Sequence, residues 1–562
     1  MADYLHGAYG QVNAVGTRVA DEGSGAIVYI GTAPVHTVTG GRENVNRPVR
    51  VGNMAEARRA LGYSDNWAAY TLCEAMMAHF SEKGVGPLVF INVFDPEKHC
   101  ASTEKTVSKT PSEGAFTISD AANIDVSSIV ITGKTEGEDY TVSYNSETSA
   151  ITVAEKTSGS LGTSALTITY REATVSTVSK TPVNGVVTIT SAGDIILDSI
   201  AVTGKTKGTD YSAVYDADRE KITLTELSYG ALGTSALSIS YKTVDASSVT
   251  AEDVIGASDG LGKNTGVFAV KNVYQTTGLI PSFLAAPGFS SVPAIHEAMY
   301  ANSVKINGHW DAYMFVDLPI VHDGNAVTLD SVVSFKSACG YNKENETVYF
   351  PLAQGMDGKI YHLSTLAAAN FQELLISQDG IPYRTASNTD CGLIQNLYLG
   401  PDNVGRVFDD SIINEKLNRN GIASAAFVGG RGAIWGAHSA DYGQGTATPV
   451  NLAETNRMML YYISNDFQAR RAQDVDEPLT MNGLKSIISD EQARLDALTN
   501  IGALIYGSVS LNADSDALSD VYSGDWSFSF NVTTTPLAKS MTAIVNWTED
   551  GLETYFQFED AV

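Results

Sequence analysis

Apolar and polar residues follow two different patterns along this chain. Between about residues 106 and 245, short runs rich in Val, Ile, Thr and Tyr alternate in polarity, as at residues 140–144, and Gly, Asn and Asp separate them. This period of two is typical of half-buried β-strands joined by turns. On both sides, continuous apolar runs such as residues 88–94 alternate with stretches of helical period. The pattern predicts an all-β part inside a largely parallel α/β sheet.

The β-rich part is a tandem duplication. Residues 107–111 (VSKTP) recur at residues 178–182, and Tyr140 recurs at Tyr211, in each case 71 residues later. Two copies are too few for a solenoid, which gains its stability from three or more stacked repeats. We therefore predict two separate, sandwich-like all-β modules, each with its own core. The first module spans residues 106–174 and the second spans residues 175–245.

The flanking stretches predict one α/β domain that the two modules interrupt. Residues 25–31 and 312–318 are buried-strand candidates, and Asn53 can cap a helix that Gly62 ends. These signals lie on both sides of the duplication. We expect a discontinuous domain formed by residues 25–105 and 246–400, preceded by an N-terminal arm at residues 1–24.

The last part of the chain changes character again. Helical patterns at residues 452–471 and 484–498 are followed by strand patterns at residues 503–511, 526–532 and 541–547. A further strand is predicted at residues 552–558. We expect an α+β inner domain at residues 405–510 and terminal strands with an arm at residues 511–562.

Length and charge narrow the function. A chain of 562 residues has room for roughly three to five domains. Its 64 acidic against 36 basic residues give a net charge of −28, which argues against nucleic acid or an anionic membrane as the main partner. No apolar run approaches the ~20 residues of a membrane span, and the first 20 residues do not resemble an export signal. We expect a chain made and kept in a cytoplasm, without membrane insertion.

The sequence offers only weak candidates for catalytic, cofactor-binding or metal-binding residues. Gly133-Lys-Thr135 and its copy at residues 204–206 lack the earlier glycine of a phosphate loop, so a β-turn is favoured in each module. Residues 162–164 (GTS) are interpreted as a hairpin turn, and residues 429–432 (GGRG) as a glycine-rich turn. The four cysteines form no C-x-x-C pair, and the histidines form no H-E-x-x-H. We predict no catalytic residue, no cofactor and no metal, and therefore no enzyme.

Outside the duplication, several short stretches follow one another in a specific order: IVYIG at 27–31, RPVRV at 47–51, LVFINV at 88–93, LAAPG at 284–288, VDLP at 316–319, VYFP at 348–351, LNRNGI at 417–422 and NVTTTPLA at 531–538. In these stretches and in their order, the chain resembles the contractile tail sheath proteins of bacteriophages and related injection machines. The resemblance implies that the α/β domain is a subtilisin-like outer domain, a name that describes the fold only. The duplication departs from the family pattern and would decorate the outer surface.

The resemblance also implies a structural role. Sheath subunits stack as hexameric rings around a tail tube, and their terminal arms add strands to neighbouring subunits. The implied partners are further copies of the chain, the tail tube protein, the baseplate and the tail terminator, in a virion tail assembled in the host bacterial cytoplasm. The residues proposed for the inter-subunit strand arms are Tyr9, Val12, Val15, Leu552, Thr554, Phe556 and Phe558.

Two alternatives come from other classes of protein. A cell-surface or S-layer-like structural protein or adhesin would explain the β repeats and the acidity, but it should carry an export signal. A subtilisin-like hydrolase would explain the α/β domain, but it requires a Ser–His–Asp set that the sequence does not reveal.

Overall fold

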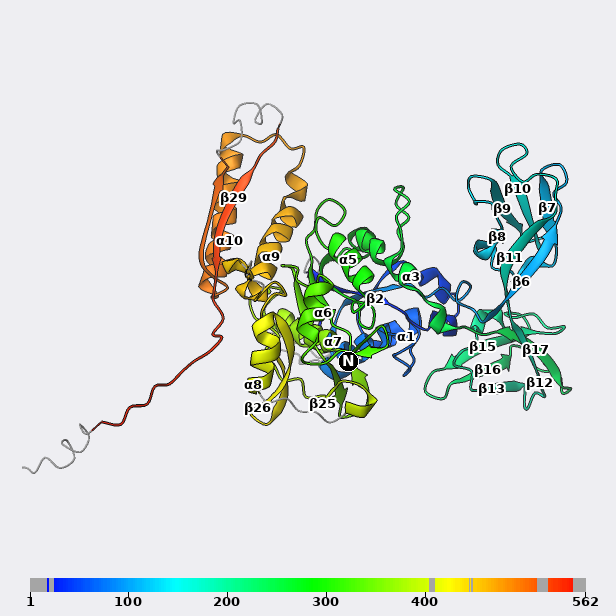
Figure 1. The fold of residues 1–562 in the computed structure, drawn as a ribbon, viewed down its shortest axis with the longest axis horizontal. Coiled ribbons are helices and arrows are strands. Elements are labelled where there is room, and N and C mark those ends of the chain that lie inside the picture. Colours follow the sequence, from blue (N-terminus) through cyan, green and yellow to red (C-terminus); the bar gives the residue numbers. More distant parts are fainter. Residues whose placement is uncertain are drawn as a thin grey trace, which may run out of the picture. The chain divides into compact units, whose positions relative to one another are not determined.

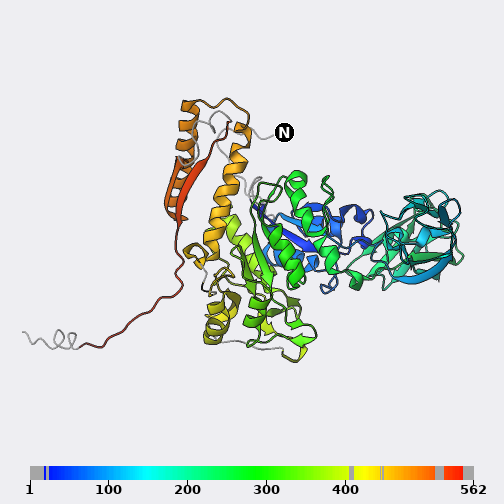
Figure 2. The ribbon, with the colours of Figure 1, turned by 45° about the horizontal axis from the view of Figure 1, so that its top comes forward.

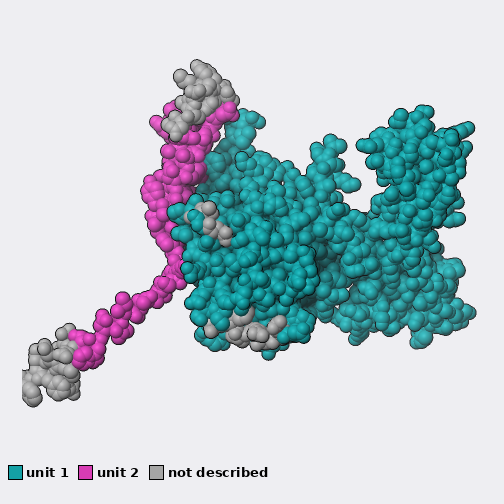
Figure 3. Space-filling model, in the orientation of Figure 1, with its two compact units in different colours: residues 1–477 teal, residues 478–562 magenta. Residues whose placement is uncertain are grey.

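The computed structural model describes residues 18–19, 25–403, 410–443, 445, 448–512 and 524–548. The chain divides into two compact units, residues 1–477 and residues 478–562 (Figure 3). The first unit contains a mixed α/β sheet and both β modules. The second contains a long helix and a two-stranded sheet. The prediction of a multidomain, mixed α/β protein is confirmed in these general terms.

An eight-stranded sheet forms the centre of the first unit (Figure 1). Its six inner strands are parallel, and the two outer strands run antiparallel to their neighbours. In spatial order the strands are β27 (Arg431–Trp435), β26 (Ile422–Val428), β22 (Glu346–Tyr349), β19 (Tyr313–Asp317), β18 (Ile280–Ala285), β2 (Gly25–Gly31), β5 (Leu88–Asn92) and β3 (Pro48–Val51).

The continuous apolar runs arise because helices bury both faces of this sheet. Along β2, Ile27 and Tyr29 point into one hydrophobic cluster, whereas Val28 and Ile30 point into another. The first cluster includes α1 (Met54–Leu61), α2 (Leu72–Met76) and α7 (Leu363–Ser377), and the second includes α3 (Ala251–Ile255), α5 (Pro293–Ala301) and α6 (Val332–Ala338).

The predicted start and end of α1 are confirmed. The Asn53 side chain accepts a hydrogen bond from the backbone N–H of Glu56 at 3.0 Å, and Gly62 ends the helix at φ +76°. Because a capping side chain satisfies an otherwise orphaned N–H, this short helix begins at a defined residue.

The sheet continues further along the chain than the sequence predicts. Sequence analysis begins a new domain at residue 405, but β26 pairs with β22 and the β26–β27 hairpin completes the large sheet. Both Gly429 and Gly430 have positive φ in the connecting turn, as a tight two-residue hairpin requires. The glycine-rich turn is confirmed, and residues 422–435 belong to the same sheet as residues 25–31.

Each β module consists of two three-stranded sheets. In the first module the sheets are β7-β10-β9 and β6-β11-β8; in the second they are β13-β16-β15 and β12-β17-β14. The strands are β6 (Ser102–Lys109), β7 (Ala115–Ile118), β8 (Val130–Ile131), β9 (Tyr140–Asn145), β10 (Ala150–Glu155), β11 (Leu166–Ala173), β12 (Val175–Lys180), β13 (Val186–Thr190), β14 (Ala201–Val202), β15 (Tyr211–Asp216), β16 (Lys221–Glu226) and β17 (Leu237–Lys242).

The two modules repeat one another in detail. Each has its own buried hydrophobic cluster. Tyr140 donates a hydrogen bond to the backbone oxygen of Ile129 at 3.2 Å, and Tyr211 donates to Ile200 at the same distance. Residues 162–164 differ from the hairpin turn that sequence analysis favours, since they connect β10 to β11, which lie in different sheets.

The chain enters the pair of modules and leaves it again at one place. Cys100 and Val244 form an antiparallel bridge, and the N–H of Ala101 donates to the oxygen of Thr243 at 2.8 Å. Since the two connections lie side by side, the duplication is an insertion. The described part of the first unit outside residues 101–244 is called the body below.

The second unit contains α10 (Met481–Asn500) and the antiparallel strands β28 (Leu504–Leu511) and β29 (Phe528–Thr534). Figure 2 shows the strands lying along the helix. The side chain of Thr480 caps α10 at the N–H of Gly483, and Leu484, Leu495 and Leu498 are buried. The predicted helix and first two strands are therefore confirmed, although β29 begins two residues later than predicted.

Candidate functional site

The carboxyl ends of the parallel strands hold a buried polar cluster, at the position where open α/β sheets commonly bind ligands. Asp317, the last residue of β19, accepts hydrogen bonds from the backbone N–H and the hydroxyl of Ser364, at 3.0 and 2.5 Å. Beside it, Glu74 of α2 accepts from the backbone N–H of His362 at 2.6 Å and lies 2.7 Å from its Nδ1. Asp317 and Glu74 are each 1% exposed.

The charges in this cluster compensate one another. Burial lowers the pKa of His362, but the charge of Glu74 and its hydrogen bond outweigh that effect and raise the pKa from 6.5 to about 9. Burial raises the pKa of Asp317, while His362 and Ser364 oppose this rise. His362 is therefore charged near pH 7 and fixes the start of α7 to α2.

This cluster is not a hydrolytic triad. The hydroxyl of Ser364 donates to a carboxylate, whereas a nucleophilic serine must give its proton to an imidazole. In the described part of the chain, no serine hydroxyl or cysteine thiol is hydrogen-bonded to a histidine. Space is also lacking: a Cβ added at Gly288 would lie 3.1 Å from Thr71 and 3.8 Å from His362. The cluster holds helices to the sheet.

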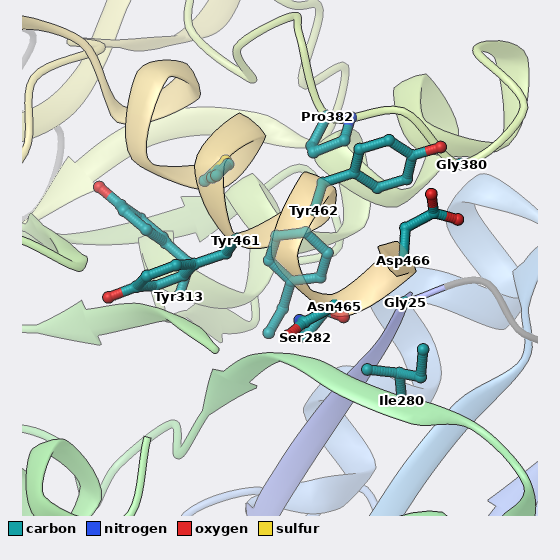
Figure 4. A pocket seen from close by; sticks show the side chains of 12 residues that line it. Gly25, Ile280, Ser282, Tyr313, Gly380, Pro382, Tyr461, Tyr462, Asn465 and Asp466 are labelled. Atoms are coloured by element: carbon teal, nitrogen blue, oxygen red, sulfur yellow. The ribbon is translucent and has the colours of Figure 1, made fainter. Parts of the chain in front are cut away.

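A small pocket lies at the opposite, amino end of the strands (Figure 4). Gly25, Ile280 and Tyr313 line it from the sheet, and Tyr461 and Asn465 line it from α9 (Glu454–Arg471). Its cavity volume is about 30 Å³, which is room for about one water molecule. A metabolite does not fit.

The side chains around the pocket instead attach α9 to the sheet. Asn465 accepts from the N–H of Asp311 at 3.0 Å and donates to its oxygen at 2.8 Å. At the other end of α9, the buried carboxylate of Glu454 accepts from the hydroxyls of Thr347 and Thr385, at 2.6 and 2.5 Å. Polar contacts thus fix the helix at its first residue and again in its C-terminal half.

The remaining sequence candidates are structural as well. The N–H of Lys134 donates to Ile131 at 3.0 Å, and that of Lys205 to Val202 at 3.0 Å, which confirms a β-turn at each Gly-Lys-Thr. Burial raises the pKa of both Cys73 and Cys391 to about 12, so neither is a reactive thiolate near neutral pH. Within the described residues, no group of His, Cys, Asp and Glu is arranged to hold a metal, and no helix has the length and apolarity to cross a membrane.

The most unusual surface lies in residues 541–547, called the terminal segment below. Its large apolar side chains Met541, Ile544, Val545 and Trp547 are 90%, 81%, 90% and 76% exposed. The segment pairs with no strand among the described residues, although sequence analysis predicts a strand there. Contiguous exposed apolar side chains on an extended backbone mark an interaction site.

The sheet of β28 and β29 is a second unfinished feature. In the described part of the chain β28 pairs only with β29, so this sheet has two strands, fewer than the roughly four to six that are usual. Ile505 and Tyr506 of β28 are 57% and 55% exposed. This sheet therefore offers an edge to which another strand can be added.

The seven residues predicted for the strand arms lie outside the described residues, so their role stays a prediction: Tyr9, Val12, Val15, Leu552, Thr554, Phe556 and Phe558. Sequence analysis predicted a strand at residues 541–547 but did not name its side chains among the arm residues. The signal for such a role was the close spacing of Ile544, Val545 and Trp547, which puts apolar residues on both sides of a strand.

Comparison with known proteins gives one curated relative and several similar structures. No protein-family model matches the chain. A tail sheath protein of Burkholderia phage BcepMu is 25% identical over 320 residues, which is 57% of this chain and 50% of the relative. The chain thus matches about half the length of that relative.

Solved structures of sheath proteins superpose loosely on the chain. The sheath tail protein of Desulfitobacterium hafniense is 10% identical, with a TM-score of 0.44 and coverage of 91% of this chain and 94% of that one. The sheath tail protein of Listeria innocua is 12% identical, with a TM-score of 0.42 and coverage of 92% and 96%. The resemblance predicted from the sequence is confirmed by the curated relative.

Proposed function

We propose that this chain is the subunit of a contractile tail sheath, which polymerises around a tail tube and contracts to drive that tube through a host cell envelope. The main support for the proposal is the exposed terminal segment, because it is unfavourable for a soluble monomer to expose four large apolar side chains to water. The resemblance to a phage tail sheath protein supplies the kind of polymer.

The terminal segment pairs as a strand with the β28–β29 sheet of a neighbouring copy. Each backbone hydrogen bond of such an added strand contributes about 0.5–1.5 kcal/mol net. The contribution recurs at every subunit, so an interface that is weak for one pair holds a whole ring and its neighbours together. The predicted arm residues at both ends of the chain extend the same exchange.

The assembly has hexameric rings stacked helically, and its partners are the tail tube protein, the baseplate and the tail terminator. It is located in a virion tail and assembles in the host bacterial cytoplasm. The body takes the place of the subtilisin-like outer domain, and the β modules decorate the outside. No nucleotide site is needed, since contraction releases the free-energy difference between two packings of the same subunits.

The test is assembly of the purified chain, followed by sedimentation and negative-stain electron microscopy. The double variant Ile544→Asp with Val545→Asp places charge on the terminal segment and should abolish polymers, with unchanged circular dichroism. Ser540→Asp, an exposed substitution just before the segment, is the matched control and should assemble normally. Tubes from the double variant would refute the proposal, and flat two-dimensional arrays would favour the S-layer-like alternative.

The decorative role of the modules has its own test. Joining Lys105 to Ala246 removes nearly the whole insertion, whose two connections already lie side by side. We expect the shortened chain to form the same polymers as the complete one. A folded chain without modules that forms neither rings nor tubes would show that the modules are part of the assembly interface.

A further inference from the structure

The two β modules have the same backbone fold but carry different side chains at one end. The N–H of Asp125 donates to the oxygen of Arg171 in the first module, and that of Ile196 donates to Lys242 in the second, both at 3.0 Å. These pairs correspond at the 71-residue offset of the duplication. The strands that support this end are therefore the same, and its side chains are what distinguish the copies.

In the second module this end is docked on the body. The Nε2 of His36 lies 2.8 Å from the backbone oxygen of Gly193, and the His36 ring is 2% exposed, next to Tyr70 and Phe94. Burial lowers the pKa of His36 to about 4, so the ring is neutral at pH 7 and can donate this hydrogen bond. A buried histidine side chain thus binds one backbone oxygen of the module.

Two further contacts complete the interface. The backbone N–H of Gly40 donates to Oδ2 of Asp198 at 2.8 Å, and Lys207 holds the same carboxylate from within the module at 3.2 Å. Ile196 packs against the hydrophobic cluster of the body. The ion pair of Arg58 with Asp218 lies at the exposed rim, where such pairs contribute little.

The first module carries different residues at the equivalent positions. Ala122 corresponds to Gly193, Asp125 to Ile196 and Ser127 to Asp198. Asp125 is paired with Arg171 at 2.6 Å inside its own module. Among the described residues, no side-chain hydrogen bond or ion pair links residues 102–173 to the body.

An open cleft takes the place of an interface for the first module. Its volume is about 850 Å³, and its lining includes Arg42 and Asp95 of the body, Asn123 and Asp125 of the first module, and the edge of the second module at Ile196 and Asp198. The first module therefore turns its equivalent end toward a charged, open space.

We propose that residues 35–42 of the body form a binding site specific for the end of the second module. Ile196 is the specificity-determining residue, because the carboxylate that replaces it in the first module would lose part of its hydration against the apolar cluster of the body. The inference does not rest on the sheath role.

Hydrogen exchange of the complete chain, followed by mass spectrometry, tests the site. Ile196→Asp gives the second module the residue of the first and should raise exchange in residues 35–42 by about tenfold or more, while β16 in the module core stays protected. Asp125→Ala, the equivalent position in the first module, is the matched control and should leave residues 35–42 unchanged.

A milder variant keeps the test decisive if Ile196→Asp disturbs folding. Asp198→Ser, which also copies the first module, removes the acceptor for the N–H of Gly40 and should raise exchange there by a few fold. Unchanged exchange in residues 35–42 in a folded Ile196→Asp variant would overturn the proposal. So would an unchanged Asp198→Ser variant, or an equal effect of Asp125→Ala.

Discussion

Replacing Glu74 by Gln should remove a defined, pH-dependent part of the stability of the body. Glu74 is 1% exposed, and its two oxygens hold the backbone N–H and the ring of His362 at the start of α7. Glutamine keeps the size and one hydrogen-bond acceptor but loses the charge. The variant therefore isolates the electrostatic part of the contact.

The magnitude follows from the pKa of His362, which rises from 6.5 to about 9 in the folded chain. At about 1.36 kcal/mol for each pH unit, the charged pair contributes roughly 3 kcal/mol. Because the folded pKa is raised, this contribution is fully present below pH 6.5 and is lost as the pH rises through about 9. For a domain of this size, 3 kcal/mol corresponds to about 6 °C in melting temperature.

Thermal unfolding of both chains between pH 6 and 9.5 measures the effect. The melting temperature of Glu74→Gln should lie about 6 °C below that of the parent at pH 6, and the difference should shrink toward pH 9.5. Glu97→Gln removes the exposed partner of Arg42 and should change the melting temperature by about 1 °C or less, without this pH dependence. A Glu74→Gln difference that stays constant across the range would refute the assigned charge on His362.

Two further predictions concern the modules and the thiols. Tyr140→Phe and Tyr211→Phe each remove a buried hydrogen bond of 3.2 Å and should each destabilise their own module by about 1 kcal/mol. Because the two copies share this geometry, calorimetry should give equal losses of stability. Unequal losses would contradict that equivalence. Iodoacetamide at pH 8 should modify Cys339 before Cys73 and Cys391 in the folded chain, since Cys339 is partly exposed and the other two are buried with a pKa of about 12. Peptide mass spectrometry gives the order of modification. Early modification of Cys73 would contradict this prediction.

Local signals predicted most of the fold. Three predicted features each depend on neighbouring residues or on one repeated pattern: the Asn53 cap, the continuous apolar run of β2 and the constant register of the duplication. Such features can be read without knowing which strands meet. The turns at Gly133 and at Gly429 and Gly430 were predictable for the same reason.

Features that depend on distant contacts were not predictable. The place of β26 in the large sheet depends on its pairing with β22, which lies more than 70 residues earlier in the chain. The start of the helix predicted at residues 452–471 is another example: the helix begins after Ala453, and the Asn451 side chain donates to Asp441 at 2.7 Å. Likewise, Glu74 and His362 are separated by 288 residues, so no local pattern brings them together.

The most direct test of the sheath proposal is a cryo-electron microscopy reconstruction of the polymer formed by the 562-residue chain. We expect a hollow tube of sixfold rings, in which residues 541–547 of one subunit run as a strand beside β28 or β29 of a neighbouring subunit. Subunits that remain monomeric under assembling conditions, or a polymer in which residues 541–547 fold back on their own chain, would contradict it.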